Sequence, residues 1–224
     1  MQKEIDCADL RELLWRGGGT LLESSNEGTI VRGDKDGTII TDYMDGEKLC
    51  RKLEKLEQDN LDQFSVKSME VAQTLAGRYG LQVKDPCSQW VYCKKTPPKT
   101  GEYDIHRVKP EEAPEAAKYY HLMDDSLGYL QDRIAARRLW GIYENGALAG
   151  FAGLHTEGSM GLLEVLPQYR RKGYGYALEA YLIAWHLRHG YLPFGQVYEG
   201  NESSERLQMK LGMTKAALPA IWVY

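Results

Sequence analysis

Residues 159–190 read SMGLLEVLPQYRRKGYGYALEAYLIAWHLRHG, and this stretch decides the fold of the chain around it. Between its two apolar segments lies a basic run that two glycines follow: Arg170, Arg171, Lys172, Gly173 and Gly175. The first apolar segment is predicted to be a strand that ends before Pro167. Residues 174–189 are predicted to form an apolar helix that Gly190 ends. The stretch therefore predicts a strand, a basic glycine loop and a helix.

The basic glycine loop has the properties of an anion site. At the start of a helix several backbone N–H groups have no partner, and the helix dipole adds positive potential. Gly173 and Gly175 lack the β-carbons that would keep a bulky anion away from these amides. The ATP-type loop GxxxxGK[ST] is absent, and GxGxxG fails because its third glycine position is Leu178. The loop is predicted to hold a phosphate or pyrophosphate; the alternative is an exposed basic turn that caps the helix.

The composition of the whole chain excludes several classes of protein. Its 224 residues carry a net charge of −4, with 43% hydrophobic and 27% charged residues, as in soluble globular proteins. A pI near 5.8 argues against a nucleic-acid partner. No run reaches the roughly 18 apolar residues of a membrane span, and no signal peptide is recognisable at the N-terminus. Four scattered cysteines and five histidines show neither CxxC nor HExxH spacing, so we expect reduced thiols, no metal and a cytoplasmic protein.

The clearest break in the chain is KKTPPKTGE, residues 94–102, because adjacent prolines and basic residues favour an extended connector. We expect an N-terminal αβ segment over 1–95, a linker over 96–102 and a second domain over 103–224. Asn145-Gly146 is a strong hairpin signal, and Asn201 is a candidate N-cap. The elements expected after the linker are strands at 103–108, 139–143, 147–155, 159–166, 194–198 and 217–224, and helices at 110–122, 125–140, 174–189 and 202–211.

The N-terminal segment partly echoes the end of the chain. Residues 79–81 (YGL) match 211–213 (LGM), and residues 90–92 (WVY) match 222–224 at the same spacing. An equal offset across a helix and the next strand indicates a duplicated helix–strand unit, and chance similarity is the alternative. The same offset places the basic loop on residues 38–41 (TIIT), so the first half lacks that loop.

Over residues 103–224 the sequence resembles the GNAT superfamily of acyl-CoA-dependent acyltransferases. The resemblance rests on LEVLPQYRRKGYGYAL, on QVYEGN and on NESSERLQMKLGM. LPQYRRKGY and the QV…N…Trp ending are also similar to the glycine N-acyltransferase branch. The resemblance implies an α/β (α+β) fold with a mixed, mainly antiparallel sheet flanked by helices, and with the N-terminal segment as a degenerate half of the same fold. It also implies acetyl-CoA or another acyl-CoA as cosubstrate, no metal, and a small-molecule amine or amino acid as acceptor.

The resemblance also assigns the cosubstrate site. The pyrophosphate would lie on the loop and the pantetheine arm along the strand before it, on these residues: Leu163, Val165, Arg170, Arg171, Lys172, Gly173, Tyr174 and Gly175. Asn201 and Ser204 match positions beside the thioester arm, although helix capping also explains Asn201.

The usual proton-transfer residues of the family are absent, because Ser159 stands at the glutamate base position and Gln208 at the tyrosine acid position. The candidate substitutes are Glu164, Glu157, His155 and Tyr198. Each has a structural alternative: Glu164 could pair with the basic loop, Glu157 could be a turn residue, His155 a strand edge, and Tyr198 a packing residue. The sequence therefore leaves three functions open. One is an N-acyltransferase, working by direct attack of an amine on the thioester. The second is a catalytically weak or inactive CoA-binding sensor, and the third is a phosphate-ligand module unrelated to CoA. Each of these could be a monomer or a homodimer.

Overall fold

The computed structural model describes residues 2–121 and 125–224. The chain divides into two compact units. Unit 1 comprises Met1–Val91, Phe194–Arg206 and Met213–Tyr224, and unit 2 comprises Tyr92–Pro193 and Leu207–Gly212. No helix among the described residues is both long and apolar enough to cross a membrane.

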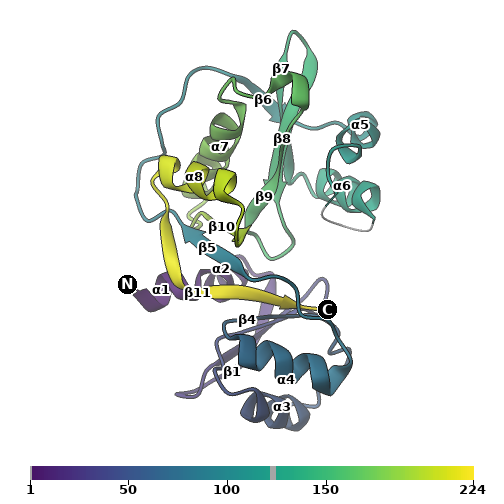
Figure 1. Cartoon of the computed structure of the whole chain (residues 1–224), viewed down its shortest axis with the longest axis vertical. Coiled ribbons are helices and arrows are strands. Elements are labelled where there is room, and N and C mark those ends of the chain that lie inside the picture. The colour runs from purple at the N-terminus through teal and green to yellow at the C-terminus, as the bar shows by residue number, and fades with distance from the viewer. Residues whose placement is uncertain (1, 122–124) are drawn as a thin grey trace. The chain divides into compact units, whose positions relative to one another are not determined.

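Unit 1 is a seven-stranded sheet with helices on both faces, counted over the described residues (Figure 1). Its strand order is β1-β2-β3-β4-β11-β5-β10, and only the β3–β4 pair is parallel. Ile30 and Ile39 belong to the core cluster with α3 and α4, whereas their neighbours Val31 and Ile40 pack with α2. This alternation is expected because successive strand residues point to opposite faces. The elements are α1 (Gln2–Asp6), α2 (Ala8–Trp15), β1 (Gly19–Ser24), β2 (Thr29–Gly33), β3 (Ile39–Thr41), α3 (Gly46–Lys55), β4 (Phe64–Val66), α4 (Met69–Tyr79), β5 (Cys87–Val91), β10 (Phe194–Tyr198), the start of α8 (Glu202–Leu211) and β11 (Thr214–Val223).

Unit 2 is an antiparallel sheet of order β9-β8-β7-β6. Helix α7 covers one face, and α5 and α6 cover the other (Figure 1). The turn between β7 and β8 has Asn145 at φ 53° and Gly146 at φ 79°, which confirms the predicted hairpin. The elements are β6 (Asp104–Arg107), the 3-10 turn η1 (Pro110–Glu112), α5 (Ala113–Ala117), α6 (Ser126–Ala135), β7 (Leu139–Glu144), β8 (Ala147–Leu154), β9 (Met160–Val165), the 3-10 turn η2 (Pro167–Tyr169), α7 (Tyr174–Arg188) and the end of α8.

The two halves of the chain share one order of elements. Strands β1, β2 and β3 are followed by α3, β4, α4 and β5, just as β7, β8 and β9 are followed by α7, β10, α8 and β11. Their last strands are exchanged: β11 pairs with β4 of the first half, and β5 pairs with β10 of the second. This exchange brings β10 and β11 into unit 1, so the units do not follow a boundary at residues 96–102.

The loop that precedes α3 differs chemically from the loop that precedes α7. Residues 42–45 read DYMD and contain no basic residue. Asp42 accepts a hydrogen bond from the Thr29 backbone N–H, and Asp45 caps α3 by accepting one from the Lys48 N–H. Carboxylates at this position repel phosphate, so the first half has no counterpart of the basic loop.

Several predicted element boundaries differ from the structure. The helix expected over 110–122 is two short pieces that end at Ala117, because Pro110 and Pro114 each fit only the first turn of a helix; Leu122 lies outside the described residues. The helix expected over 125–140 ends at Ala135, where Arg137 adopts φ 57° and turns the chain into β7. The last strand begins earlier than expected, at Thr214.

Candidate functional site

The basic loop lies in unit 2 between η2 and α7. Gly173 is the N-cap of α7 with φ +84°, a left-handed conformation in which glycine is strongly favoured. The Ala177 N–H bonds to the Gly173 carbonyl at 3.0 Å, which closes the first turn of the helix. The N–H groups that precede Ala177 in this turn have no acceptor within the helix. They are the groups that an anion at the helix start would contact.

Gly175, in the first turn of α7, has room for a β-carbon. A β-carbon built on Gly175 would lie 3.8 Å from Leu163, Val165 and Leu207, which is ordinary van der Waals contact. Packing within unit 2 therefore tolerates alanine at this position. A glycine that neither packing nor a positive φ requires is consistent with a ligand that approaches the helix closely. In this respect the residues fit the diphosphate of coenzyme A.

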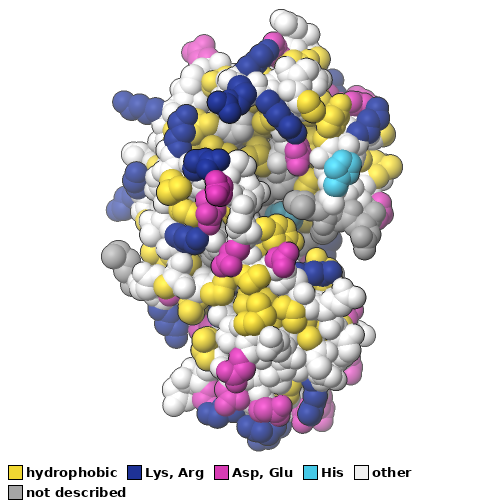
Figure 2. All heavy atoms as spheres, viewed as in Figure 1, with side chains coloured by type: hydrophobic (Ala, Val, Ile, Leu, Met, Phe, Trp, Pro, Cys, Tyr) yellow, Lys and Arg dark blue, Asp and Glu magenta, His cyan; other side chains and the backbone are white. Residues whose placement is uncertain are grey.

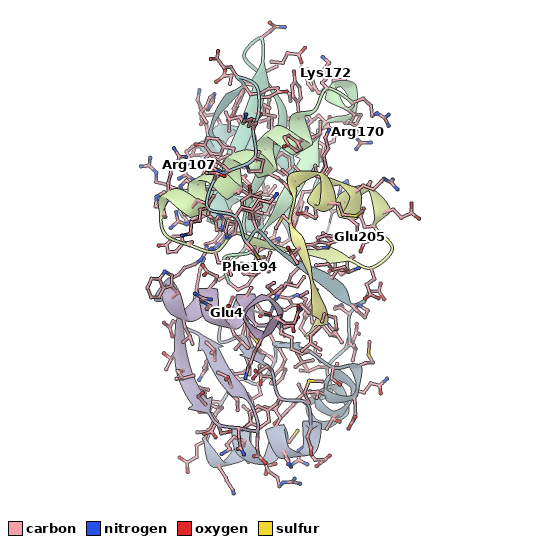
Figure 3. The ribbon with its side chains drawn as sticks, turned by 90° about the vertical axis from the view of Figure 1, so that its left-hand side faces the viewer. Glu4, Arg107, Arg170, Lys172, Phe194 and Glu205 are labelled. Carbon is pink, nitrogen blue, oxygen red and sulfur yellow. The ribbon has the colours of Figure 1, made fainter. Side chains whose placement is uncertain are left out.

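The cations of the loop have different roles. On the face shown in Figure 2, Lys and Arg side chains gather over the region where Figure 1 places the elements of unit 2. Arg170 donates from Nε to the Val165 carbonyl at 3.0 Å, and Arg171 is exposed with φ +65°. Lys172 places its Nζ 2.8 Å and 2.9 Å from the two carboxylate oxygens of Glu144. Arg170 and Lys172 both lie at the loop in Figure 3. Arg170 and Arg171 thus remain as cations without a carboxylate partner among the described residues.

Glu144 is a loop-positioning residue that sequence reasoning missed. Besides binding Lys172, its carboxylate accepts a hydrogen bond from the Tyr174 hydroxyl. These two hydrogen bonds lower the pKa of Glu144, and the same contact raises the pKa of Tyr174 to about 12. Glu144 ends β7, far from the loop in sequence, so no local signal could have linked the two.

Strand β9 contains a β-bulge beside the predicted thioester position. Gly161 faces Gly153 and Glu164 faces Phe151, so Leu162 and Leu163 together lie opposite the single residue of β8 between them. Leu162 adopts φ 54°, which is uncommon for a leucine and which the sequence did not indicate. A bulge removes backbone groups from the regular ladder and makes them available to a ligand. The predicted backbone site includes Leu163 of this bulge and Val165 just after it.

Glu164 lies half-buried on β9. It pairs across the sheet with Phe151, a member of the core cluster formed with α5 and α6. Burial raises the pKa of Glu164, and the positive charges of Arg170 and His121 oppose this shift. Among the described residues its carboxylate accepts no hydrogen bond and makes no ion pair within 4.0 Å, so the charge of Arg170 acts on it without direct contact.

His155, Glu157, Ser159 and Tyr129 form one polar cluster where β8 ends and β9 begins. The Tyr129 hydroxyl lies 2.8 Å from His155 Nδ1, and the Ser159 hydroxyl donates to the Glu157 carboxylate. Burial lowers the pKa of His155, which favours the neutral imidazole. Glu157 lies in the turn before β9 and not in the strand. The structure thus joins Ser159, at the family's base position, to one of the predicted substitutes.

Gly161→Ala is expected to disrupt this cluster. A β-carbon at Gly161 would lie 2.5 Å from His155 Nε2, so the imidazole must move and the Tyr129 contact is lost. We expect the free energy of unfolding to fall by about 1–3 kcal/mol in urea titrations. His155→Ala removes the clash, so a double-mutant cycle should show strong coupling between the two changes. Additive effects would contradict this explanation.

The remaining predicted site residues belong to unit 1. Asn201 Oδ1 accepts a hydrogen bond from the Ser204 backbone N–H at 3.2 Å and from the Ser203 hydroxyl at 3.0 Å, so Asn201 caps α8. Tyr198 is 37% exposed, and burial of its remainder together with the nearby Cys87 raises its pKa to about 12. A phenol with this pKa stays protonated near neutrality and is able to donate a proton.

Comparisons with known proteins concern the family and the fold of this chain. The model of the acetyltransferase (GNAT) family matches residues 102–213. No curated protein matched the sequence. The fold is similar to that of a Drosophila structural genomics target, with a TM-score of 0.62 and 18% identity over 96% of this chain and 85% of that one.

Two bacterial structures extend the likeness to the full length of the chain. A GCN5-related N-acetyltransferase from Kribbella flavida is 13% identical, with a TM-score of 0.62 over 100% of this chain and 95% of that one. An acetyltransferase from the GNAT family from Colwellia psychrerythraea is 15% identical, with a TM-score of 0.57 over 100% and 97%. None of these names is that of a glycine N-acyltransferase, so that finer assignment stays a prediction. The family match over half of the chain, on a fold of helix-flanked, mainly antiparallel sheet, shows that the protein belongs to the acetyltransferase (GNAT) family.

Proposed function

We propose that this protein transfers an acetyl group from acetyl-CoA to the amine of a small molecule or amino acid. The observation that carries the proposal is the first turn of α7, which has unpaired amides and a glycine that packing does not require, next to the bulged strand β9. An anionic diphosphate fits the helix start, and the arm that leads from it to a thioester fits the strand.

Different residues of unit 2 would bind different parts of the cosubstrate. The amides of the first turn of α7, with Arg170 and Arg171, would hold the diphosphate. Glu144 would fix the loop through Lys172 and Tyr174. The backbone of Leu163 and Val165 would align the thioester arm. Donors fixed in advance near the thioester carbonyl stabilise the negative charge that develops there during attack.

Glu164 is the general base in this proposal. The neutral amine attacks the thioester carbon, and the new C–N bond forms as the nitrogen loses a proton to the Glu164 carboxylate. The C–S bond then breaks with its electron pair on sulfur, and the thiolate takes a proton from water. A half-buried carboxylate with a raised pKa and no hydrogen-bond donor among the described residues is suited to accept this proton near neutral pH.

Gly175→Ala tests the diphosphate site without disturbing the fold. The added methyl group makes only ordinary contacts with the protein, and under this proposal it would keep the diphosphate from a close approach to the helix amides. We expect the dissociation constant for CoA to rise at least about tenfold, close to 1.4 kcal/mol, with unchanged thermal stability in the absence of CoA. Calorimetric titration with CoA measures the effect, and the melting midpoint should rise with CoA only for the wild type.

Gly77→Ala is the matched control for this variant. Gly77 lies in α4 of unit 1, and nothing lies within 4 Å of a β-carbon built there. This variant should bind CoA as the wild type does. If Gly175→Ala and the wild type bind CoA with equal affinity, the diphosphate does not bind at this loop.

A CoA-binding sensor is the second candidate function, because both usual proton-transfer positions hold side chains that are already engaged. Ser159 bonds to Glu157, and Gln208 is buried and bonds to Glu179. Release of free thiol from acetyl-CoA with a panel of amines and amino acids separates the two functions. Thiol release above the hydrolysis background supports the enzyme. Tight CoA binding with no release for any acceptor supports the sensor.

A further inference from the structure

A groove in unit 2 runs along α7 and reaches the basic loop at Tyr103, whose ring centre lies 5.9 Å from that of Tyr174. It has a volume of about 600 Å³ and lies between α7 and the segment of residues 95–105. Ala177, Ala180 and Ala184 of α7 form its floor, because residues spaced three and four apart lie on one face of a helix. Pro97 and Pro98 contribute to the opposite wall. The volume lies within the range of small-molecule sites.

The charged residues that line the groove are mostly cationic. Lys95 and Arg188 contribute to its lining, against the single carboxylate of Glu102. The Arg188 guanidinium lies 5.9 Å from the ring centre of Tyr181, which also lines the groove. Arg188 is exposed at the end of α7, so its guanidinium is accessible to a ligand in the groove.

Further arginines gather next to Tyr181. The ring centre of Trp140 lies 6.1 Å from that of Tyr181, and the Arg107 guanidinium lies 3.6 Å from the Trp140 ring centre. Arg107 donates to the Arg137 carbonyl. Burial is the main cause that lowers the pKa of Arg107 to about 10; Tyr181 opposes this shift, and the positive charges of Arg138 and Arg137 add to it. Like charges are thus held together beyond Tyr181, behind the lining of the groove.

No carboxylate neutralises this group of cations. Within residues 2–121 and 125–224, none of the following makes an ion pair within 4.0 Å: Lys95, Arg107, Arg137, Arg138 and Arg188. Figure 3 shows Arg107 on the side of unit 2 away from Arg170 and Lys172, so this group is distinct from the basic loop. In a chain with more acidic than basic residues, such a cluster repels itself and favours a bound anion.

We propose that the groove binds an amphipathic carboxylate, a small molecule with an apolar body and one anionic end. The alanine face of α7 and the two prolines accept the apolar body. The carboxylate lies at the Arg188 end, where a guanidinium fork is able to bind it with two parallel hydrogen bonds. Charge complementarity selects this ligand, because a neutral molecule of the same shape leaves the cations without a partner.

Calorimetric titration with 4-phenylbutyrate, in the absence of CoA, tests the site. We expect saturable binding at least about tenfold tighter than that of the neutral amide, 4-phenylbutyramide. Arg188→Ala should weaken binding of the acid about tenfold and leave binding of the amide unchanged. Arg188 is exposed, so this variant is expected to fold normally.

Arg206→Ala is the matched control. Arg206 is an exposed arginine of α8 whose guanidinium lies 2.9 Å from Glu202, and its loss should not change binding of phenylbutyrate. Ala184→Leu fills the groove and should weaken the acid and the amide alike. Three results would overturn the proposal: no saturable binding at millimolar concentration, equal affinity for acid and amide, or unchanged affinity in Arg188→Ala.

Discussion

Glu164→Gln is expected to lower kcat by about 10²–10⁴-fold while the protein stays folded and binds CoA normally, because an amide cannot accept the proton that the attacking amine loses. The side chain is half-buried and makes no hydrogen bond among the described residues, so the isosteric amide removes no contact. Thiol release under saturating acetyl-CoA measures kcat, and calorimetry with CoA confirms binding.

The pH profile separates a base from a merely structural residue. Burial raises the pKa of Glu164, so wild-type activity should fall as the pH drops through that raised pKa and the carboxylate becomes protonated. Glu164→Gln should have a lower kcat and a pH profile without this acidic limb. Glu157→Gln serves as the comparison, because Glu157 is already engaged by the Ser159 hydroxyl. If Glu157→Gln lowers kcat and abolishes the acidic limb of the pH profile while Glu164→Gln changes neither, the base is Glu157 instead.

The second large effect is expected at Glu179, a carboxyl of α7 that is only 5% exposed. Within the described part of the chain its hydrogen-bond partner is an amide: Gln208 Nε2 donates to Glu179 Oε2 at 2.8 Å. Burial raises the pKa of Glu179 from 4.5 to about 7, and the bond from Gln208 opposes this shift. Gln208 Oε1 is buried and has no donor within the described part of the chain. A protonated Glu179 is able to supply that donor, so the neutral acid completes a reciprocal pair with the amide.

The sign of the resulting pH dependence follows from the raised pKa. Between pH 4.5 and about 7 the folded protein holds a proton on Glu179 that the unfolded chain has lost, so stability falls as the pH rises through this window. Glu179→Gln keeps the shape, supplies a donor for Gln208 and cannot ionise. Its free energy of unfolding relative to wild type should therefore grow by about 2–3 kcal/mol between pH 5 and pH 8.

Urea unfolding at pH 5, 6, 7 and 8 measures this difference. Glu202→Gln is the control, because Glu202 is exposed on α8 and its removal should leave the pH dependence as in the wild type. A Glu179→Gln variant whose stability follows the wild-type curve at every pH would show that Glu179 is ionised, or equally protonated, in both states.

The features that the sequence predicted correctly are those encoded by neighbouring residues. The run of basic residues and glycines marks the start of α7, Asn145-Gly146 marks the hairpin between β7 and β8, and β10 spans the expected residues 194–198. Each depends on local backbone preferences and on the spacing of apolar residues. Both can be read from a short stretch of sequence. The family follows from the same local motif and is confirmed by the match over residues 102–213.

Only the tertiary structure decided the features that join distant segments. In the folded protein Glu144 bonds to Lys172 and Tyr174, and Glu179 bonds to Gln208. Strand β9 has a bulge at Leu162. The tertiary structure also exchanged β5 and β11 between the halves. Local sequence sets which residues form a strand or a loop. Which strands pair, and which buried carboxyl meets an amide, depends on the burial and hydrogen bonding available once the whole chain has packed, and no local pattern records these energies.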